Sequence, residues 1–298
     1  MRKKQNINYL KNEYLGRAFV TFCGLLIVAI TLSIIVFIFN KGIQSFIHSN
    51  ISIIEMLTST KWAPNTTGDG SYGALVFIGG STIVSLGAVL ISTPIGIALA
   101  IFMNHISPRF GSKVLKPVLE LLVGVPSVVY GLLGVTIVVP LLRNQFGGVG
   151  FSLLAGIIVL SVMILPTIAS LADDAIKNVP FDFLEASYGL GSTRWQTIWR
   201  VIIPASSKGI LTGIILGLAR AFGEALAVQM VIGNTIKLPD SLYSPTSTLT
   251  GILTMDMANT INGTAWNNAL WSLAMILLLI SFLFILLIRA VGRKGDIK

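Results

Sequence analysis

Long apolar segments alternate with shorter polar ones along the chain. Six segments are long enough to cross the roughly 30 Å hydrocarbon core of a membrane, which takes about 20 apolar residues in a helix. They cover residues 18–39, 74–103, 117–142, 151–171, 210–232 and 269–291. The second contains Gly79, Gly80 and Pro94, so we expect it to be kinked or irregular at one end. The pattern predicts an all-α protein with six transmembrane helices.

The composition supports a membrane protein. Of the 298 residues, 54% are hydrophobic and 11% are charged, whereas soluble domains carry about 25% charged residues. The single cysteine, Cys23, lies in the first apolar segment. It excludes an internal disulfide, and we expect it to be an inert packing residue.

Basic residues predict which side each polar segment faces. With a cytoplasmic N-terminus, the inner segments hold sixteen Lys and Arg residues, and the polar outer loops hold only Lys41, Lys61, Arg143 and Lys237. Lys and Arg concentrate on the cytoplasmic side of membrane proteins. We therefore expect a basic cytoplasmic segment 1–17, a six-span domain 18–291 and a cytoplasmic tail 292–298. This distribution accounts for the net charge of +9 and argues against nucleic-acid binding.

The longest predicted inner loop, residues 172–209, has the pattern of a helix–turn–helix. Pro180 suits the first turn of a helix, and Gly191 ends that helix. Thr193 with Gln196 forms a capping box for a second helix. The second helix carries an apolar stripe at helical spacing, formed by Trp195, Ile198, Trp199 and Ile202 and ended by Pro204. On this pattern alone, the loop is either a surface for a partner or an amphipathic connector on lipid headgroups.

Two opposite charges, Arg220 and Glu224, lie inside the fifth apolar segment. A charge at bilayer depth costs about 2.5–3.5 kcal/mol. At positions i and i+4 the two side chains share a helix face, so they can pair and fix helix packing. Alternatively they line a pathway, because the arginine fork suits an oxyanion and a nearby glutamate gives it a partner when the anion is absent.

Other polar positions have simpler interpretations. We expect Asp173 and Asp174 to be solvated loop charges, and Lys116 to pair locally with Glu120 at the membrane interface. Pro126 lies within the third segment, where freed backbone groups must face protein or water rather than lipid.

Motifs for catalysis are missing from the sequence. No Lys is followed by Ser or Thr, so there is no Walker A loop. His48 and His105 are far apart and form no metal-binding motif. We expect no cofactor and no enzymatic activity, so the energy for any transport enters through another chain or an ion gradient.

Residue spacing in the inner loop resembles a known motif. Glu185, Ala186 and Ser187, then Gly191, and nine residues later the run ending at Pro204, resemble the EAA loop of ABC-importer permeases. In that family the loop forms a coupling helix that docks on the ATP-hydrolysing subunit. The resemblance implies that these five residues couple the chain to such a subunit.

Further segments, at residues 120–134, 160–180 and 220–234, look like the C-type membrane subunits of phosphate-specific ABC importers. That resemblance implies the MetI-like permease fold in a bacterial or archaeal cytoplasmic membrane. It also implies three kinds of partner: an A-type permease subunit, a dimer of ATP-hydrolysing subunits and an external or periplasmic phosphate-binding protein. Arg220 and Glu224 match residues implicated in phosphate passage. Two alternatives stay open: another oxyanion such as sulfate or molybdate, or an ion-coupled secondary transporter.

Overall fold

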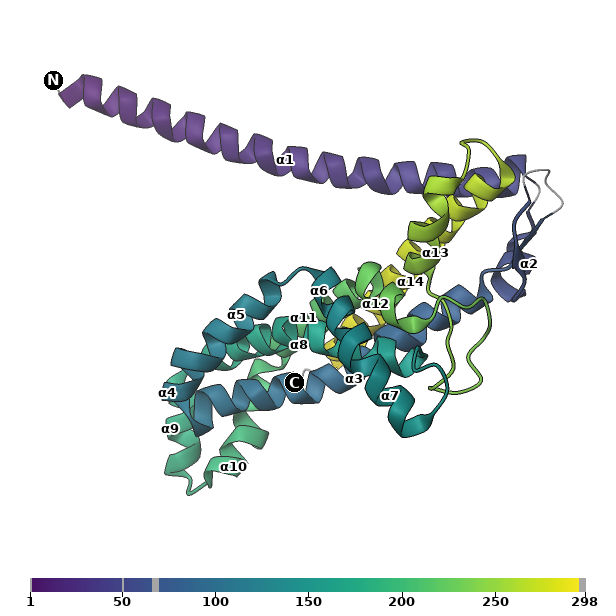
Figure 1. The fold of residues 1–298 in the computed structure, drawn as a ribbon. Helices are drawn as coiled ribbons and strands as arrows, with labels where there is room; N and C mark the ends of the chain where they lie inside the picture. The colour runs from purple at the N-terminus through teal and green to yellow at the C-terminus, as the bar shows by residue number, and fades with distance from the viewer. Residues whose placement is uncertain (1, 50, 66–69, 295–298) are drawn as a thin grey trace.

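A computed structural model describes residues 2–49, 51–65 and 70–294, and it is almost entirely helical (Figure 1). Within these residues, six helical segments are long and apolar enough to cross a membrane, which confirms the predicted number: Glu13–Ile47, Leu75–Ile106, Ser127–Phe146, Leu153–Lys177, Arg194–Gly223 and Ala265–Ala290. Residues 1 and 295–298 of the two predicted cytoplasmic ends lie outside the described residues.

The elements follow one another in this order: α1 (Arg2–His48), α2 (Ile53–Thr58), β1 (Trp62–Ala63), β2 (Ser71–Tyr72), α3 (Leu75–Ile101), η1 (Phe102–Ile106), α4 (Pro108–Phe110), η2 (Gly111–Leu115), α5 (Lys116–Gly124), α6 (Ser127–Leu133), η3 (Gly134–Val138), α7 (Val139–Phe146), α8 (Leu153–Lys177), α9 (Phe181–Gly189), α10 (Arg194–Thr197), η4 (Ile198–Ile202), α11 (Ile203–Gly223), α12 (Leu226–Ile232), α13 (Leu249–Asp256), η5 (Met257–Asn259) and α14 (Ala265–Lys294). β1 and β2 form a short antiparallel pair in which Trp62 faces Tyr72.

Two of the predicted spans differ from the observed helices. The third predicted span is interrupted at Val125 and Pro126, where the backbone is extended between α5 and α6. The fifth begins earlier than predicted, at α10, and breaks at Glu224 before α12. The second span is irregular at its C-terminal end, as expected, where the π-helical turn η1 follows α3.

Helix α8 is the centre of the bundle and packs against α3 on one side and α11 on the other (Figure 1). Its buried Ile168 fits against glycines of both neighbours. A Cβ atom at Gly96 of α3 would lie 3.0 Å from Ile168 Cγ2, and one at Gly217 of α11 would lie 2.8 Å from Ile168 Cγ1. Membrane helices associate by close packing at small residues. Ile168 therefore sets the spacing of the three central helices.

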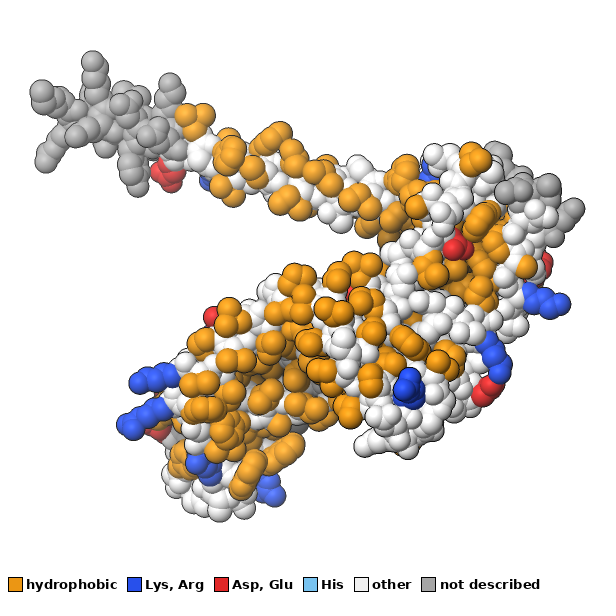
Figure 2. All heavy atoms as spheres, in the orientation of Figure 1, with side chains coloured by type: hydrophobic (Ala, Val, Ile, Leu, Met, Phe, Trp, Pro, Cys, Tyr) orange, Lys and Arg blue, Asp and Glu red, His pale blue; other side chains and the backbone are white. Residues whose placement is uncertain are grey.

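Helix α1 extends away from this bundle and contacts it near its own C-terminal end (Figure 1). Ser272 of α14 donates a hydrogen bond to the Gly42 carbonyl at 2.5 Å, and Asn268 donates one to Ser49 at 3.1 Å. The preceding turns of α1 expose apolar side chains around the helix (Figure 2). Such a surface suits lipid or another membrane helix.

The predicted outer loop after the fifth span is exposed over residues 240–243, as its polar sequence suggests, but buried at its end. Thr246, Ser247 and Thr248 are each at most 3% exposed, and α13 begins directly after them. Their polar groups are satisfied inside the fold, because the Thr246 amide donates to the Ile232 carbonyl and the Thr248 hydroxyl caps α13. At this end of the loop, a polar sequence is therefore no sign of exposure.

Candidate functional site

Arg220 lies in the last turn of α11, inside the helical bundle and partly buried. Its Nη1 donates a hydrogen bond to the Thr167 hydroxyl of α8 at 3.1 Å. Thr167 follows Pro166, which lies inside α8, and precedes the packing residue Ile168. An arginine has five N–H donors. Thr167 is the hydrogen-bond partner that the described residues provide for it, so most of the guanidinium fork stays available to an oxyanion.

Of the two alternatives for Arg220 and Glu224, the local pair is not formed: these two described residues make no ion pair in the structure. Helix α11 ends at Gly223, and the extended backbone of Glu224 (φ −76°, ψ 123°) takes its side chain out of the helical register. One Glu224 carboxylate oxygen accepts the Ala227 amide at 3.0 Å instead. The i, i+4 argument assumed a continuous helix, and the break removes that condition.

Glu224 lines a small crevice between the α11–α12 break, α3 and the start of α13. Its lining combines the hydroxyl groups of Ser81, Ser85, Thr248 and Thr250 with apolar side chains such as Val84, Phe222 and Val228. Thr250 donates to the Glu224 carbonyl at 2.8 Å, and Ser81 accepts the Leu249 amide at 2.8 Å. Sequence analysis missed these residues because their segments looked like ordinary span or loop. The backbone at the Glu224 break is thus held by a hydroxyl group of α13.

The break in the third span lies near the same centre. The Tyr130 hydroxyl in α6 donates to the Leu122 carbonyl in α5 at 2.8 Å, which satisfies a backbone group freed by the break. Tyr130 is also within electrostatic reach of Arg220. Helix α6 packs against α12, with Gly131 close to Ala227. Irregular backbone at membrane depth occurs where it is buried in protein or lines an aqueous cavity, so the two broken helices mark the polar core of the bundle.

The helix–turn–helix predicted in the inner loop is present as α9 and α10. Gly191 has a φ of +78°, a left-handed conformation that favours glycine, and the Thr193–Gln196 capping box is formed in both directions. The buried Ser187 hydroxyl contacts the Thr197 hydroxyl at 2.9 Å and joins the two helices. The four other predicted coupling residues are exposed: Glu185, Ala186, Gly191 and Pro204.

Two details of this loop differ from prediction. The predicted apolar stripe divides between two faces, because Ile198 and Ile202 are buried while Trp195 and Trp199 are 58% and 62% exposed. The second helix of the loop is also not separate from the fifth span but continuous with it, from Arg194 to Gly223. Pro204 follows the π-helical turn η4 and lies in the first turn of α11, where a missing amide is tolerated.

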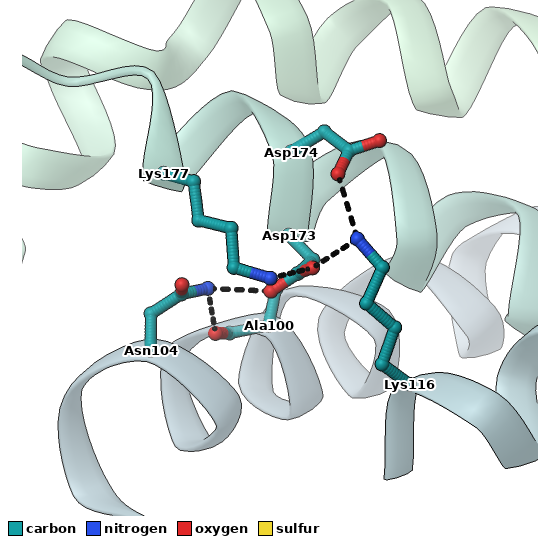
Figure 3. Close-up of polar contacts among 6 residues, drawn as sticks. All are labelled: Ala100, Asn104, Lys116, Asp173, Asp174 and Lys177. Atoms are coloured by element: carbon teal, nitrogen blue, oxygen red, sulfur yellow. Dashed lines mark hydrogen bonds and ion pairs between the residues drawn. The ribbon is translucent and has the colours of Figure 1, made fainter. Parts of the chain in front are cut away.

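The predictions for Asp173 and Lys116 are also wrong. Asp173 is 1% exposed and belongs to α8, while Lys116 reaches Asp173 and Asp174 rather than pairing with Glu120 (Figure 3). Burial disfavours the charged form of Lys116, but the carboxylates of Asp174 and Asp173 outweigh this effect and raise the pKa of Lys116 above its ordinary value. The tertiary fold brings these residues together from positions 58 apart in sequence.

No group of three His, Cys, Asp or Glu side chains in the described part of the chain is placed to hold a metal ion. The polar centre around Arg220 and the exposed α9–α10 surface are therefore the two candidate functional regions.

A family model described as binding-protein-dependent transport system inner membrane component matches residues 92–295. The chain is 53% identical to the probable ABC transporter permease protein YqgH of Bacillus subtilis, over 96% of this chain and 93% of that protein. It is 34% identical to the phosphate transport system permease protein PstC of Mesorhizobium japonicum, over 82% of this chain and 80% of that protein.

Among solved structures, the inward-facing methionine ABC transporter MetNI contains a chain that superposes with a TM-score of 0.57 at 17% identity. The match covers 74% of this chain and 95% of that one. It supports the arrangement of helices described above and confirms the predicted fold class.

Proposed function

The chain belongs to the family of binding-protein-dependent transport system inner membrane components, and from this premise we propose that it forms part of the route by which an ATP-driven importer carries inorganic phosphate into the cell. The chain is a multi-pass permease subunit of an ABC importer of the inner membrane, with the MetI-type fold. This family implies an ATP-hydrolysing partner and a binding-protein partner.

Phosphate is the proposed substrate because of the charge, position and hydrogen bonding of Arg220. The guanidinium is permanently charged, lies inside the bundle and contacts a neutral hydroxyl rather than a carboxylate. A planar fork with free donors suits the oxygens of a phosphate. Relatives named as PstC subunits of phosphate transport systems support the same substrate.

The proposed mechanism is alternating access. A binding protein delivers phosphate to the side of α2 and the β1–β2 pair, and the anion passes Arg220 and Glu224 between this chain and an A-type permease. A dimer of ATP-hydrolysing subunits docks on the loop that contains Glu185, Ala186, Ser187 and Gly191. Because one helical stretch runs from Arg194 to Gly223, a push on α10 displaces Arg220 through Pro204 and α11 as a rigid rod.

In this proposal residues 18–291 form the permease domain and residues 172–209 its cytoplasmic coupling loop, while segments 1–17 and 292–298 lie in the cytoplasm. The distribution of basic residues supports this orientation. Cysteines introduced at Glu13 and Arg289, in a Cys23→Ser background, are expected to resist a membrane-impermeant thiol reagent in intact cells and to react after permeabilisation.

The substrate is tested by radiolabelled phosphate uptake at low external phosphate in cells that lack the chain. Wild type is expected to restore uptake that needs ATP and is not inhibited by excess sulfate or molybdate. Arg220→Ala and the double variant Glu185→Ala, Gly191→Ala are expected to insert normally and fail to transport. Inhibition by sulfate or molybdate would reassign the anion. Uptake that survives ATP depletion but collapses with the membrane potential would support an ion-coupled mechanism instead.

A further inference from the structure

The charged cluster at the inner end of α8 joins three elements of the bundle (Figure 3). Asp173 accepts hydrogen bonds from Lys177 at 2.5 Å and from Asn104 of η1 at 2.7 Å. Lys116, the first residue of α5, lies 3.7 Å from an Asp173 oxygen and 3.4 Å from an Asp174 oxygen. The ammonium of Lys116 thus bridges two carboxylates of α8.

The carboxylate side of the bridge moves with the coupling loop. Only the short connection 178–180 separates α8 from α9, and the Asn178 amide donates to the Asp174 carbonyl at 3.2 Å. Ile176 of α8, Leu184 of α9 and Ile198 of η4 share one apolar cluster. A close-packed cluster moves as a unit, so displacement of the loop carries Asp173 and Asp174 with it.

The lysine side of the bridge leads to the polar core. Helix α5 runs from Lys116 to Gly124, a length of roughly 13 Å, and ends at the Val125–Pro126 break. Leu119 is the one buried side chain of α5. It packs in one cluster with Ala169 of α8, and the lysine bridge adds the polar attachment at the start of the helix. At the far end of α5, the Leu122 carbonyl accepts a hydrogen bond from Tyr130, whose helix α6 packs against α12 beyond the Glu224 break.

We propose that Lys116 is a positioning residue that transmits movement of the coupling loop through α5 to the break in the third span. The two carboxylates allow the ammonium to exchange partners as α8 shifts, so the link persists without leaving a bare charge. The inference rests on the ATP-driven mechanism proposed above but not on the identity of the transported anion.

Water access to the break tests this link without any substrate. In the complete complex, Cys23→Ser removes the single native thiol and Val125→Cys places a reporter at the break. The labelling rate of this thiol by N-ethylmaleimide is measured with and without a nonhydrolysable ATP analogue. We expect Lys116→Met, which keeps the apolar stem, to reduce the nucleotide-dependent change roughly 2–30-fold, the range for mutations along coupling networks.

Two variants serve as controls. Lys116→Arg keeps the charge and is expected to keep the nucleotide response. Lys113→Met removes an exposed lysine one turn away and is also expected to keep the response. The proposal is overturned if Lys116→Met responds like wild type, if Lys116→Arg loses the response equally, or if the reporter never responds to nucleotide. Because thiol labelling needs no anion, it reports on the Lys116 link even where the phosphate uptake assay fails. Failure of the substrate proposal and failure of the Lys116 proposal are therefore distinguishable.

Discussion

Replacing Thr167 by Val tests whether the α8 hydroxyl holds Arg220 in its working position. The two side chains have the same shape, so the substitution removes the 3.1 Å hydrogen bond to Arg220 Nη1 while leaving the neighbouring Ile168 packing intact. Hydrogen bonds to charged groups contribute about 1.5–3 kcal/mol. Because the site is only partly buried, we take about 1.5 kcal/mol, which corresponds to roughly a tenfold loss.

The assay is the initial rate of phosphate uptake in cells that lack the native chain, normalised to the amount of protein in the membrane. Thr167→Ser keeps a hydroxyl and is expected to transport near the wild-type rate. Thr136→Val is the matched control, because the Thr136 hydroxyl bonds to the Leu132 carbonyl of its own helix. Uptake by Thr167→Val within about twofold of wild type at equal membrane level would refute the positioning role. So small a loss is below the roughly tenfold effect expected from removing a hydrogen bond to a charged group.

Three further outcomes follow from packing and charge. Gly217→Val is expected to destabilise the bundle by about 1–3 kcal/mol through overpacking against Ile168, whereas Gly24→Val on exposed α1 is expected to be neutral. Thermal unfolding of both variants in detergent measures the difference, and equal destabilisation would contradict the close packing of Gly217 against Ile168. Asp173→Ala is expected to cost about 1.5–3 kcal/mol, because it removes hydrogen bonds to a buried charged group, whereas Asp174→Ala, at a residue that is 55% exposed, is expected to cost less than about 1 kcal/mol. The reverse order in the same melt would be inconsistent with the contacts in Figure 3. Burial raises the pKa of Asp256, partly countered by Trp62 and Trp266. The folded state therefore holds this proton more tightly than the unfolded state, so the stabilisation is complete below the ordinary value of 3.8 and is lost as pH rises through the raised pKa. Asp256→Asn should remove this pH dependence from the melting curve, and an unchanged curve would exclude Asp256 as its source.

Local patterns in the chain predicted the elements that depend on local interactions. Six apolar segments of sufficient length became six membrane-length helices within the described residues, because backbone groups in lipid must be satisfied inside the segment. The Thr193–Gln196 capping box and the turn at Gly191 formed as predicted, since each involves residues three positions apart or a single backbone conformation.

Polar partnerships across the bundle were decided by the tertiary structure alone. Arg220 bonds to Thr167, 53 residues away, and Lys116 prefers two carboxylates on α8 to Glu120 on its own helix. Periodicity ranks neighbours on one helix, but it carries no information about which helix packs alongside. Burial of the run 246–248 was likewise not predicted, because it depends on packing against neighbouring elements rather than on the polarity of the run itself.

The sequence by itself determined that the chain crosses the membrane, how many helices are long enough to do so and where the helix–turn–helix before the fifth span forms, because these properties follow from hydrophobicity and local hydrogen bonding. Only the tertiary structure decided that the two broken spans meet and that Glu224 leaves Arg220 unpaired. A helix breaks inside a membrane where neighbouring elements satisfy the freed backbone groups. Thr250 does this for the Glu224 carbonyl from 26 residues further along the chain, so packing rather than the sequence next to the break brings it into place.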